Sequence, residues 1–211
     1  MKNSYKIILM AVTLILSVTA VNAQSFPVTF GVKGGLNISN LDLSDDDAYY
    51  KDDDPRIGYN VGITVDFALP ANLYILSGLE LTSKGTDYDR HGNEFKPNLT
   101  YLQLPVNLGY KLNVTDELGF LFYAGFFGAY GVSGKTKIDG YKYDSFGGSG
   151  IFKRFDLGIV AGVSVQYGKF IGTISCDYGF IDINNNLVNN YSSRSIDVYT
   201  QNASIGVGYK F

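Results

Sequence analysis

The sequence predicts an all-β fold, an eight-stranded antiparallel up-and-down transmembrane β-barrel. Three observations lead to this prediction. Eight strand-like segments can be recognised, seven of which alternate apolar and polar residues. The connections between them are alternately long and short, and the chain opens with an export signal. The composition agrees, because 17 tyrosines, 14 phenylalanines and 25 glycines without a tryptophan are typical of a β-rich protein.

The beginning of the chain has the organisation of a cleaved signal peptide. Lys2 and Lys6 give it a basic start, the apolar run 7–20 follows, and cleavage is expected between Ala23 and Gln24. A transmembrane anchor is the alternative. It is disfavoured because a helix needs about 20 apolar residues to cross ~30 Å of hydrocarbon.

The predicted domains are therefore a cleaved signal peptide, 1–23, and an outer-membrane β-barrel domain, 24–211. Cleavage leaves 15 basic and 20 acidic side chains, a net charge of −5. No basic stripe is present, so the sequence does not indicate a nucleic-acid-binding protein. The single cysteine, Cys176, excludes an internal disulfide.

The strands are expected where apolar residues recur at every second position. In chain order, their ranges are 29–39, 57–67, 73–84, 101–112, 118–132, 155–167, 170–181 and 202–211. Seven of them have one clearly apolar phase: Phe30, Val32, Leu36 and Ile38; Ile57, Tyr59, Val61, Ile63, Val65 and Phe67; Leu73, Ile75, Leu79 and Leu81; Leu102, Leu104, Val106, Leu108 and Tyr110; Leu157, Ile159, Ala161, Val163 and Val165; Ile174, Cys176, Tyr178 and Phe180; Ala203, Ile205, Val207, Tyr209 and Phe211. The strand at 118–132 is apolar in both phases, so its register stays open.

Long and short connections alternate strictly along the chain. The short ones are the turns around 70–72, 113–117 and 168–169, and the long ones are 40–56, 85–100, 133–154 and 182–201. Outer-membrane barrels have this asymmetry, with short periplasmic turns and long external loops. An even number of strands also brings both termini to the periplasmic side.

The polar phase favours a membrane barrel over a secreted lipocalin-like barrel, which would turn its polar phase to water. This phase is mostly Gly, Ser, Thr, Asn and Gln, which suit the narrow interior of eight strands. Closure is required because an open sheet edge cannot survive in hydrocarbon. The few charges of this phase nearly balance and are expected to pair in a closed lumen: Lys33, Lys84, Lys111 and Lys210 against Asp66, Glu80, Asp156 and Asp177. Tyr123 and Phe127 are expected to fill more of the interior. An ion path along these charges is the alternative.

Aromatic residues gather near the expected strand ends, as in the girdles of membrane barrels. One girdle is expected at the periplasmic side: Phe67, Tyr110, Phe120, Tyr167, Phe170, Tyr209 and Phe211. The other is expected at the external side: Tyr59, Tyr101, Tyr130 and Phe180.

Four segments resemble the PorT-like outer-membrane β-barrel proteins: FGVKGGLNIS at 30–39, GLELTSKG at 78–85, YLQLPV at 101–106 and GVGYKF at 206–211. The resemblance covers nearly all of the chain after residue 23. It implies the barrel fold and an outer-membrane location. The namesake of this family is tied to type IX secretion, so the resemblance also implies a secretion-accessory role. The terminal Phe211 resembles the signal that barrel-assembly machinery recognises in its clients.

The connection 40–56 is strongly acidic: Asp42, Asp45, Asp46, Asp47, Asp52, Asp53 and Asp54. Clustered carboxylates suit a hard cation such as Ca²⁺, but these runs lack the alternating spacing of an EF-hand loop. A solvated external loop is the favoured interpretation. A divalent cation that bridges the loop to lipopolysaccharide is an alternative.

Enzymatic chemistry has weak support in the sequence. A lipid-modifying barrel enzyme is the alternative function, but the single histidine, His91, lies in a turn-like segment and would need a partner such as Ser83. Cys176 falls on the apolar phase, and we expect it to act as a small apolar residue. We expect no catalytic residue, metal or cofactor, and a non-enzymatic barrel with a structural or an interaction and secretion-accessory role. The expected partners are outer-membrane lipids and lipopolysaccharide, the assembly machinery and a protein bound through the external loops.

Overall fold

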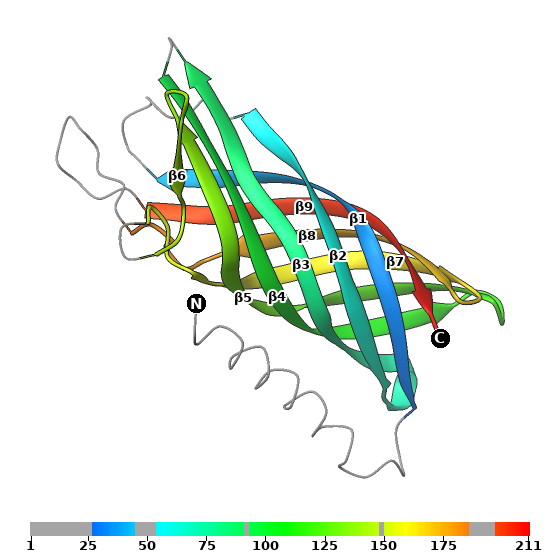
Figure 1. The fold of residues 1–211 in the computed structure, drawn as a ribbon. Helices are drawn as coiled ribbons and strands as arrows, with labels where there is room; N and C mark the ends of the chain where they lie inside the picture. The colour runs from blue at the N-terminus through cyan, green and yellow to red at the C-terminus, as the bar shows by residue number, and fades with distance from the viewer. Residues whose placement is uncertain (1–26, 45–53, 91–92, 148–149, 186–196) are drawn as a thin grey trace.

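The computed structural model describes residues 27–44, 54–90, 93–147, 150–185 and 197–211, most of which lie in strands (Figure 1). The predicted signal peptide, five acidic residues of the connection 40–56 and His91 lie outside the described residues. The elements are β1 (Val28–Ser44), β2 (Asp54–Ala68), the 3-10 turn η2 (Pro70–Asn72), β3 (Leu73–Arg90), β4 (Asn93–Asn113), β5 (Leu118–Ile138), β6 (Tyr141–Asp144), β7 (Phe155–Tyr167), β8 (Phe170–Gly179) and β9 (Asp197–Lys210). The described part of the chain contains no helix with the length and hydropathy of a membrane span.

Eight of the strands form one closed antiparallel ring. Their order around it is β1, β2, β3, β4, β5, β7, β8 and β9, and β9 pairs back onto β1. In Figure 1 the first and last strands, drawn blue and red, lie side by side. The predicted fold class is therefore confirmed.

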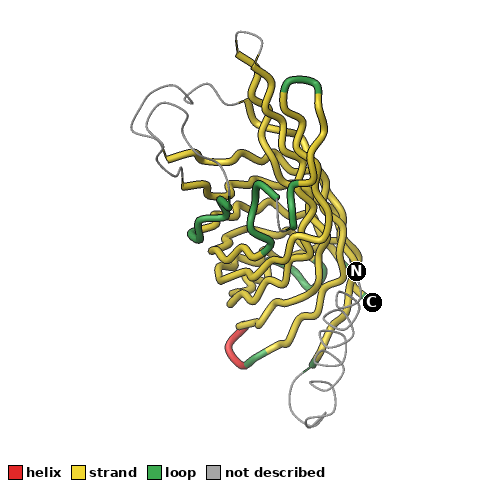
Figure 2. The backbone as a smooth tube through the Cα atoms, turned by 60° about the vertical axis from the view of Figure 1, so that its left-hand side comes forward, coloured by secondary structure: helices red, strands yellow, loops and turns green. Residues whose placement is uncertain are grey.

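The two ends of the barrel differ in their connections. At one end, which we call the short-turn end, the strands are joined by η2, residues 114–117 and Gly168-Lys169. Gly168 has a φ of 56°, a left-handed conformation that glycine adopts without strain. The opposite end, the long-loop end, carries the long connections (Figure 2).

Six strands, β1 to β5 and β9, extend further at the long-loop end than the sequence predicts, and β3, β4 and β5 extend furthest. Segment 85–100, expected as a loop, is a β-hairpin in which Gly85 pairs with Asn98 and Tyr88 with Phe95. Segment 133–154, also expected as a loop, contains the end of β5 and the additional strand β6, which pairs only with β5. The prediction ended each strand where its apolar phase ends, but backbone pairing continues beyond that point because it does not depend on apolar side chains.

These extensions form a polar sheet above the barrel. We call residues 85–90, 93–100, 133–138 and 141–144 the long-loop sheet. Figure 2 shows its two hairpins rising beyond the other strands.

The outer face of the ring is apolar and exposed. The exposed fraction of the side chain is 73% at Ile57, 60% at Leu36 and 71% at Val207. The predicted apolar phases of 29–39 and 57–67 both lie on this face. Such a surface requires a hydrocarbon environment, because large contiguous apolar patches are rare on soluble proteins.

A row of small side chains crosses this outer face. Ala124 pairs with Ala161, Ala161 with Cys176, and Cys176 with Ala203, so the row spans β5, β7, β8 and β9. The thiol of Cys176 is exposed on this face, as predicted.

Candidate functional site

The interior of the barrel contains most of its buried polar groups, and they are arranged in layers along the axis. An apolar plug with a buried ion pair among its side chains lies towards the long-loop end, and a polar cavity lies towards the short-turn end. Each layer is built by lumen-facing residues from several strands.

The apolar plug closes the mouth at the long-loop end. Its members are buried side chains from strands and connections: Leu41, Leu99, Tyr101, Phe127, Ala129, Phe146, Phe152, Val160, Ile183 and Val198. Phe146 and Phe152 come from the connection after β6, and Ile183 from the one after β8. Backbone hydrogen bonds hold these connections inside the mouth, since the N–H of Phe152 donates to the Ser145 carbonyl and that of Ile183 to the Val198 carbonyl, both at 2.9 Å.

A glycine makes room for the plug. A Cβ at Gly131 would lie 2.4 Å from the ring of Phe146, which packs edge-on against Tyr101 with 5.6 Å between ring centroids. Only a residue without a side chain allows this approach. The sequence reasoning missed Phe146, Phe152 and Ile183, because their segments showed no alternation; isolated aromatic residues in a glycine- and serine-rich connection were the available signal.

An ion pair lies among the side chains of the plug, since Lys84 pairs with Leu99 and Asp156 with Ala129 across neighbouring strands. Lys84 Nζ is 3.5 Å from Asp156 Oδ2, and both side chains are fully buried. Thr200 donates a hydrogen bond of 2.8 Å to the same oxygen. The ammonium also lies 4.3 Å from the ring centroid of Phe127 and 5.7 Å from that of Tyr101, a cation–π arrangement that partly replaces its lost hydration.

The prediction that Tyr101 belongs to the outer aromatic girdle is therefore wrong. Tyr101 is buried in the lumen, in the same phase as Gln103 and Asn107. Counting positions along β4 would have placed it there. A β-bulge lies on β5 beside Tyr101, since Thr100 pairs with Ser133 but Tyr101 pairs with Gly131. The other girdle residues remain on the outer face.

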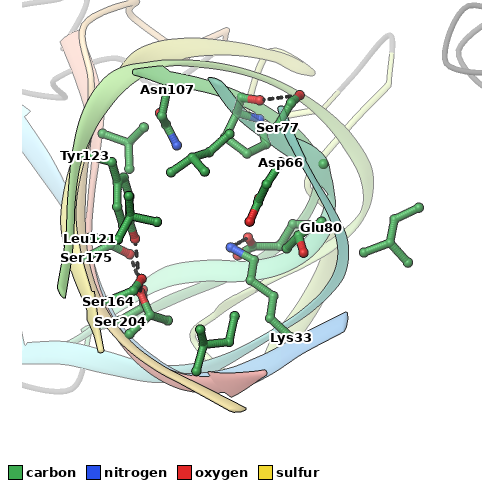
Figure 3. Close-up of a pocket in the computed structure, with 18 of the residues that line it drawn as sticks. Lys33, Asp66, Ser77, Glu80, Asn107, Leu121, Tyr123, Ser164, Ser175 and Ser204 are labelled. Atoms are coloured by element: carbon green, nitrogen blue, oxygen red, sulfur yellow. Dashed lines mark hydrogen bonds and ion pairs between the residues drawn. The ribbon is translucent and has the colours of Figure 1, made fainter. Parts of the chain in front are cut away.

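A polar cavity of about 90 Å³ occupies the half of the lumen towards the short-turn end. Its lining includes Val160 of the plug and, at the strand ends, Asp66 and Lys210. Figure 3 shows Lys33 and Glu80 on one wall, with Tyr123, Ser175 and Ser204 on the opposite wall. As expected from the sequence, Tyr123 and Phe127 both face the lumen.

The charges of the lumen are largely paired, as predicted. Lys33 forms an ion pair with Glu80, and Lys210 Nζ lies 2.6 Å from Asp66 Oδ2. Lys111, at the rim, donates a hydrogen bond of 3.1 Å to Gln166.

Asp177 has neutral hydrogen-bonding partners. Its Oδ2 accepts hydrogen bonds from Gln103 Nε2 at 3.3 Å and from Asn202 Nδ2 at 3.2 Å. The bond from Gln103 crosses the lumen from β4 to β8.

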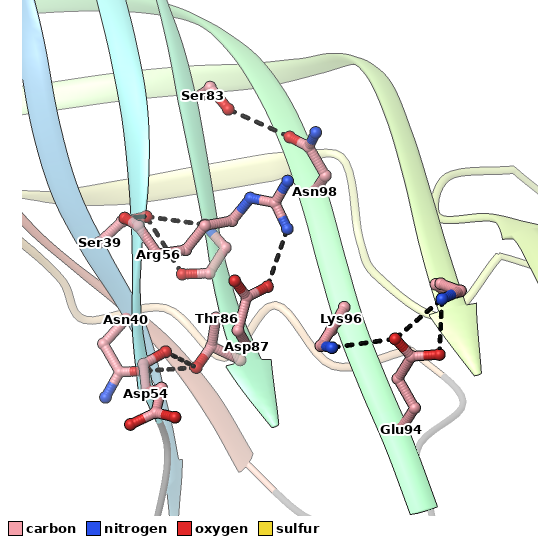
Figure 4. A network of polar contacts seen from close by, with 12 residues as sticks. Ser39, Asn40, Asp54, Arg56, Ser83, Thr86, Asp87, Glu94, Lys96 and Asn98 are labelled. Atoms are coloured by element: carbon pink, nitrogen blue, oxygen red, sulfur yellow. Dashed lines mark hydrogen bonds and ion pairs between the residues drawn. The ribbon is translucent and has the colours of Figure 1, made fainter. Parts of the chain in front are cut away.

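The long-loop sheet and the adjoining end of β2 carry a network of charges (Figure 4). Arg56 Nη1 lies 2.9 Å from Asp87 Oδ1, while Glu94 binds both Lys96 (2.9 Å) and Lys137 (2.8 Å). Glu94 lies well beyond the apolar band of β4. Hydrogen bonds from Lys137 and Lys96 lower the pKa of this carboxyl to about 2.

Asp182, in the connection after β8, organises the loop edge of the plug. Its carboxylate accepts a hydrogen bond of 2.8 Å from Lys153 and two from the backbone N–H groups of Asn184 and Val198. Burial favours the protonated form, but these hydrogen bonds outweigh it and lower the pKa of the carboxyl.

The residues considered for catalysis or metal binding are not assembled into a site in the described part of the chain. Ser83 donates a hydrogen bond of 3.1 Å to the side chain of Asn98, and its suggested partner His91 is outside that part. Asp42 accepts a hydrogen bond of 3.1 Å from Gln201. Among the described residues, no group of three His, Cys, Asp or Glu side chains is arranged to hold a metal ion.

Solved outer-membrane proteins are similar to this chain at low sequence identity. OprG from Pseudomonas aeruginosa has a TM-score of 0.52 and 14% identity, over 88% of this chain and 97% of its own. Neisserial surface protein A has a TM-score of 0.49 and 14% identity, over 88% and 99% of the two chains. Ail, the attachment invasion locus protein of Yersinia pestis, has a TM-score of 0.46 and 14% identity, over 87% and 98%.

No curated protein matches this sequence. A family model described as "Outer membrane protein beta-barrel domain" matches residues 22–185, most of the chain. The apolar outer face, the closed ring and this match agree, and the chain belongs to the outer membrane protein beta-barrel domain family.

Proposed function

We propose that this outer-membrane barrel is a non-enzymatic structural and interaction protein, with its short-turn end in the periplasm and its long-loop end outside. The observation that carries the proposal is the closed lumen beneath a projecting polar sheet. The apolar plug and the Lys84–Asp156 pair occupy the path that a solute would take. The long-loop sheet, by contrast, presents polar side chains beyond the barrel.

The long-loop sheet and the connections beside it are the proposed contact surface. Tyr141 and Tyr143 of β6 are 72% and 50% exposed, and exposed tyrosines are common in protein interfaces. The resemblance to PorT-like proteins supports a secretion-accessory role for this surface. Lys142 of β6 is exposed and offers positive charge to the phosphates of lipopolysaccharide.

The first test is electrophoresis of the outer-membrane fraction with and without boiling in detergent. We expect the protein in that fraction, with the unboiled band running faster because the closed barrel stays folded. A protein that remains soluble in the periplasm would contradict the proposal.

The contact surface is tested by placing a photo-crosslinking amino acid at Tyr143 in living cells. We expect adducts with another protein, and none from the same group at Ile174, which is 61% exposed on the outer face of the barrel. Equal adducts at both positions would contradict the proposed surface. A change in lipid acylation that depends on the protein and is abolished by His91→Ala would favour the enzyme instead.

The last residue is proposed as the contact for barrel-assembly machinery. Phe211 is 68% exposed, and its backbone N–H donates to the Phe30 carbonyl at 2.9 Å. Deletion of Phe211 should reduce the heat-modifiable fraction in cells. The same deletion should leave refolding of the purified chain in detergent unchanged, since the ring remains paired.

A further inference from the structure

We propose that the lumen cavity binds a protonated amine, either ammonium or a small primary alkylammonium, on the Asp177 carboxylate and the side-chain carbonyl of Gln103. The inference goes beyond the proposed function, because it assigns a ligand site to the interior rather than to the external surface. It rests on the charge balance of the cavity, its unused hydrogen-bond acceptors, and its size and opening.

The first argument is the charge of the cavity. Five charged side chains line it: Lys33, Lys210, Asp66, Glu80 and Asp177. Both lysines are already engaged in ion pairs, with Glu80 and Asp66. Among the described residues, Asp177 has no ion-pair partner within 4.0 Å, although only 8% of it is exposed. A carboxylate withdrawn from bulk water is stabilised by a nearby cation, so the cavity favours a ligand with one positive charge.

The second argument is the orientation of the Gln103 amide. Its Nε2 donates to Asp177, so its Oε1 is turned away from that carboxylate. If the amide of Gln103 were turned round, its Oε1 would face the Asp177 carboxylate, and two hydrogen-bond acceptors would meet. Gln103 is only 3% exposed, it lines the cavity, and its Oε1 is buried with no hydrogen-bond donor.

A second buried acceptor on the cavity lining is also without a donor. The Oδ1 atom of Asn107, whose residue is 7% exposed, has no hydrogen-bond partner. The Oγ1 atom of Thr64, another lining residue, is a third buried atom without a partner. Buried polar atoms normally have a partner. The Gln103 and Asn107 atoms can only accept, and the Thr64 hydroxyl oxygen can accept as well as donate. An ammonium group supplies three donors and one positive charge, which matches what the cavity lacks.

The third argument is space and access. The cavity of about 90 Å³ is several times larger than the ~10–15 Å³ that one water requires. It therefore has room for an ammonium group with a short carbon chain. Asp66, Lys210 and Gln166 extend the lining to the short-turn end, whereas the plug closes the other side. The ligand would enter from the short-turn end.

The test is a titration of the folded protein in detergent micelles, followed by NMR of the side-chain amides of Gln103 and Asn202. Methylammonium and ammonium chloride should each give saturable shifts of these signals. Tetramethylammonium chloride and sodium chloride at equal ionic strength should not, because these cations lack N–H donors.

Two variants locate the site. Asp177→Asn keeps the shape of the side chain but removes its charge, and should weaken methylammonium binding at least tenfold. Gln103→Leu removes the carbonyl acceptor and should weaken it as well. Asp116→Asn is the matched control, since it removes the same charge from an exposed residue of the turn 114–117, and it should bind as the unaltered protein does. Boiling-dependent migration confirms that each variant is folded.

Three results would overturn the inference. The first is the absence of any saturable shift with methylammonium or ammonium. The second is an equal shift with sodium, which would make the cavity an unselective cation site. The third is unchanged binding in folded Asp177→Asn. None of these outcomes bears on the external contact surface, so the two proposals fail separately.

Discussion

At the scale of single residues, the interior combines features that are individually costly. Lys84 and Asp156 are fully buried, and removing two charges from water has a large desolvation cost even when they attract each other. The Thr200 hydrogen bond and the rings of Phe127 and Tyr101 offset part of that cost. Each partner therefore depends on the other remaining in place.

Removing one charge of this pair should be strongly destabilising. Lys84→Met leaves the Asp156 carboxylate buried and unpaired, and should lower the free energy of unfolding by about 3–5 kcal/mol. Denaturant unfolding in lipid vesicles measures the change. The double variant with Asp156→Leu should recover most of the loss. Lys135→Met breaks the exposed pair with Asp144 and should cost less than ~1 kcal/mol. A small effect of Lys84→Met would contradict the buried pairing.

Two adjacent phenylalanines provide a comparison between the lumen and the outer face. Phe127 is 1% exposed within the plug, whereas Phe126 is 62% exposed on the outside. Phe127→Ala should lower the free energy of unfolding by about 3–5 kcal/mol, because it leaves a cavity. Phe126→Ala should cost clearly less, because lipid chains fill the space. The same unfolding assay measures both, and a reversed order would mean that the register of β5 is wrong.

At the scale of elements, alternation predicted the strands well wherever one phase is apolar. The prediction for 57–67 places every apolar residue from Ile57 to Ile63 on the exposed outer face. The strand at 118–132 left its register open because both faces are apolar. There the lumen phase supplies Phe127 and Ala129 to the plug and Leu121 and Tyr123 to the cavity wall, so its side chains are nearly as apolar as those facing lipid. Periodicity alone cannot separate these two environments.

The candidate site was less predictable than the strands. The sequence indicated that the lumen charges would pair, and the ion pairs of Lys33, Lys84 and Lys210 confirm this. It did not indicate which charge would lack a counter-ion, because that depends on distances across the barrel. It also missed the plug, whose loop residues reach the mouth only through tertiary contacts.

The charge network of the long-loop sheet should persist to low pH. The pKa of Glu94 is lowered from 4.5 to about 2, so its pairs with Lys96 and Lys137 stabilise the folded state above pH ~4.5 and are lost as the pH falls towards 2. An NMR titration of the Glu94 side chain should show this low midpoint. Lys137→Gln should raise the midpoint. A midpoint near 4.5 in the unaltered protein would contradict the network.

The two faces of β8 should differ in their reaction with thiol reagents. Cys176 lies on the outer face, and a charged water-soluble reagent should label it in vesicles only after unfolding. Ser175 lines the cavity, so Ser175→Cys in a Cys176→Ala background should react with a small charged reagent while folded. Mass spectrometry measures both reactions. Equal labelling of the two folded proteins would contradict the assignment of the faces.

At the scale of the whole molecule, the barrel is closed at one end only. The plug is assembled from strands and two connections at the long-loop end, while the cavity lining reaches the short-turn end. The fold therefore combines a sealed half at the long-loop end with a polar half at the short-turn end.

The sealed half should prevent conduction. In planar lipid bilayers, the unaltered protein should show no single-channel steps, because buried side chains fill the lumen. The double variant Phe127→Ala, Tyr101→Ala removes the two large rings beside the ion pair and should produce measurable steps. Phe122→Ala, Phe126→Ala, which alters only the outer face, is the control. Regular steps in the unaltered protein would support the ion path instead.

The position of the plug also determines where the membrane's electrical barrier lies inside this protein. A voltage across a barrel falls mainly over the segment with the fewest mobile charges, and here that segment is the apolar layer near the outer end. In the proposed orientation, the carboxylates of the cavity then lie at nearly the same potential as the periplasm, although the bilayer surrounds them. Ions of the periplasm reach them, and a change in the external medium reaches them only through that compartment.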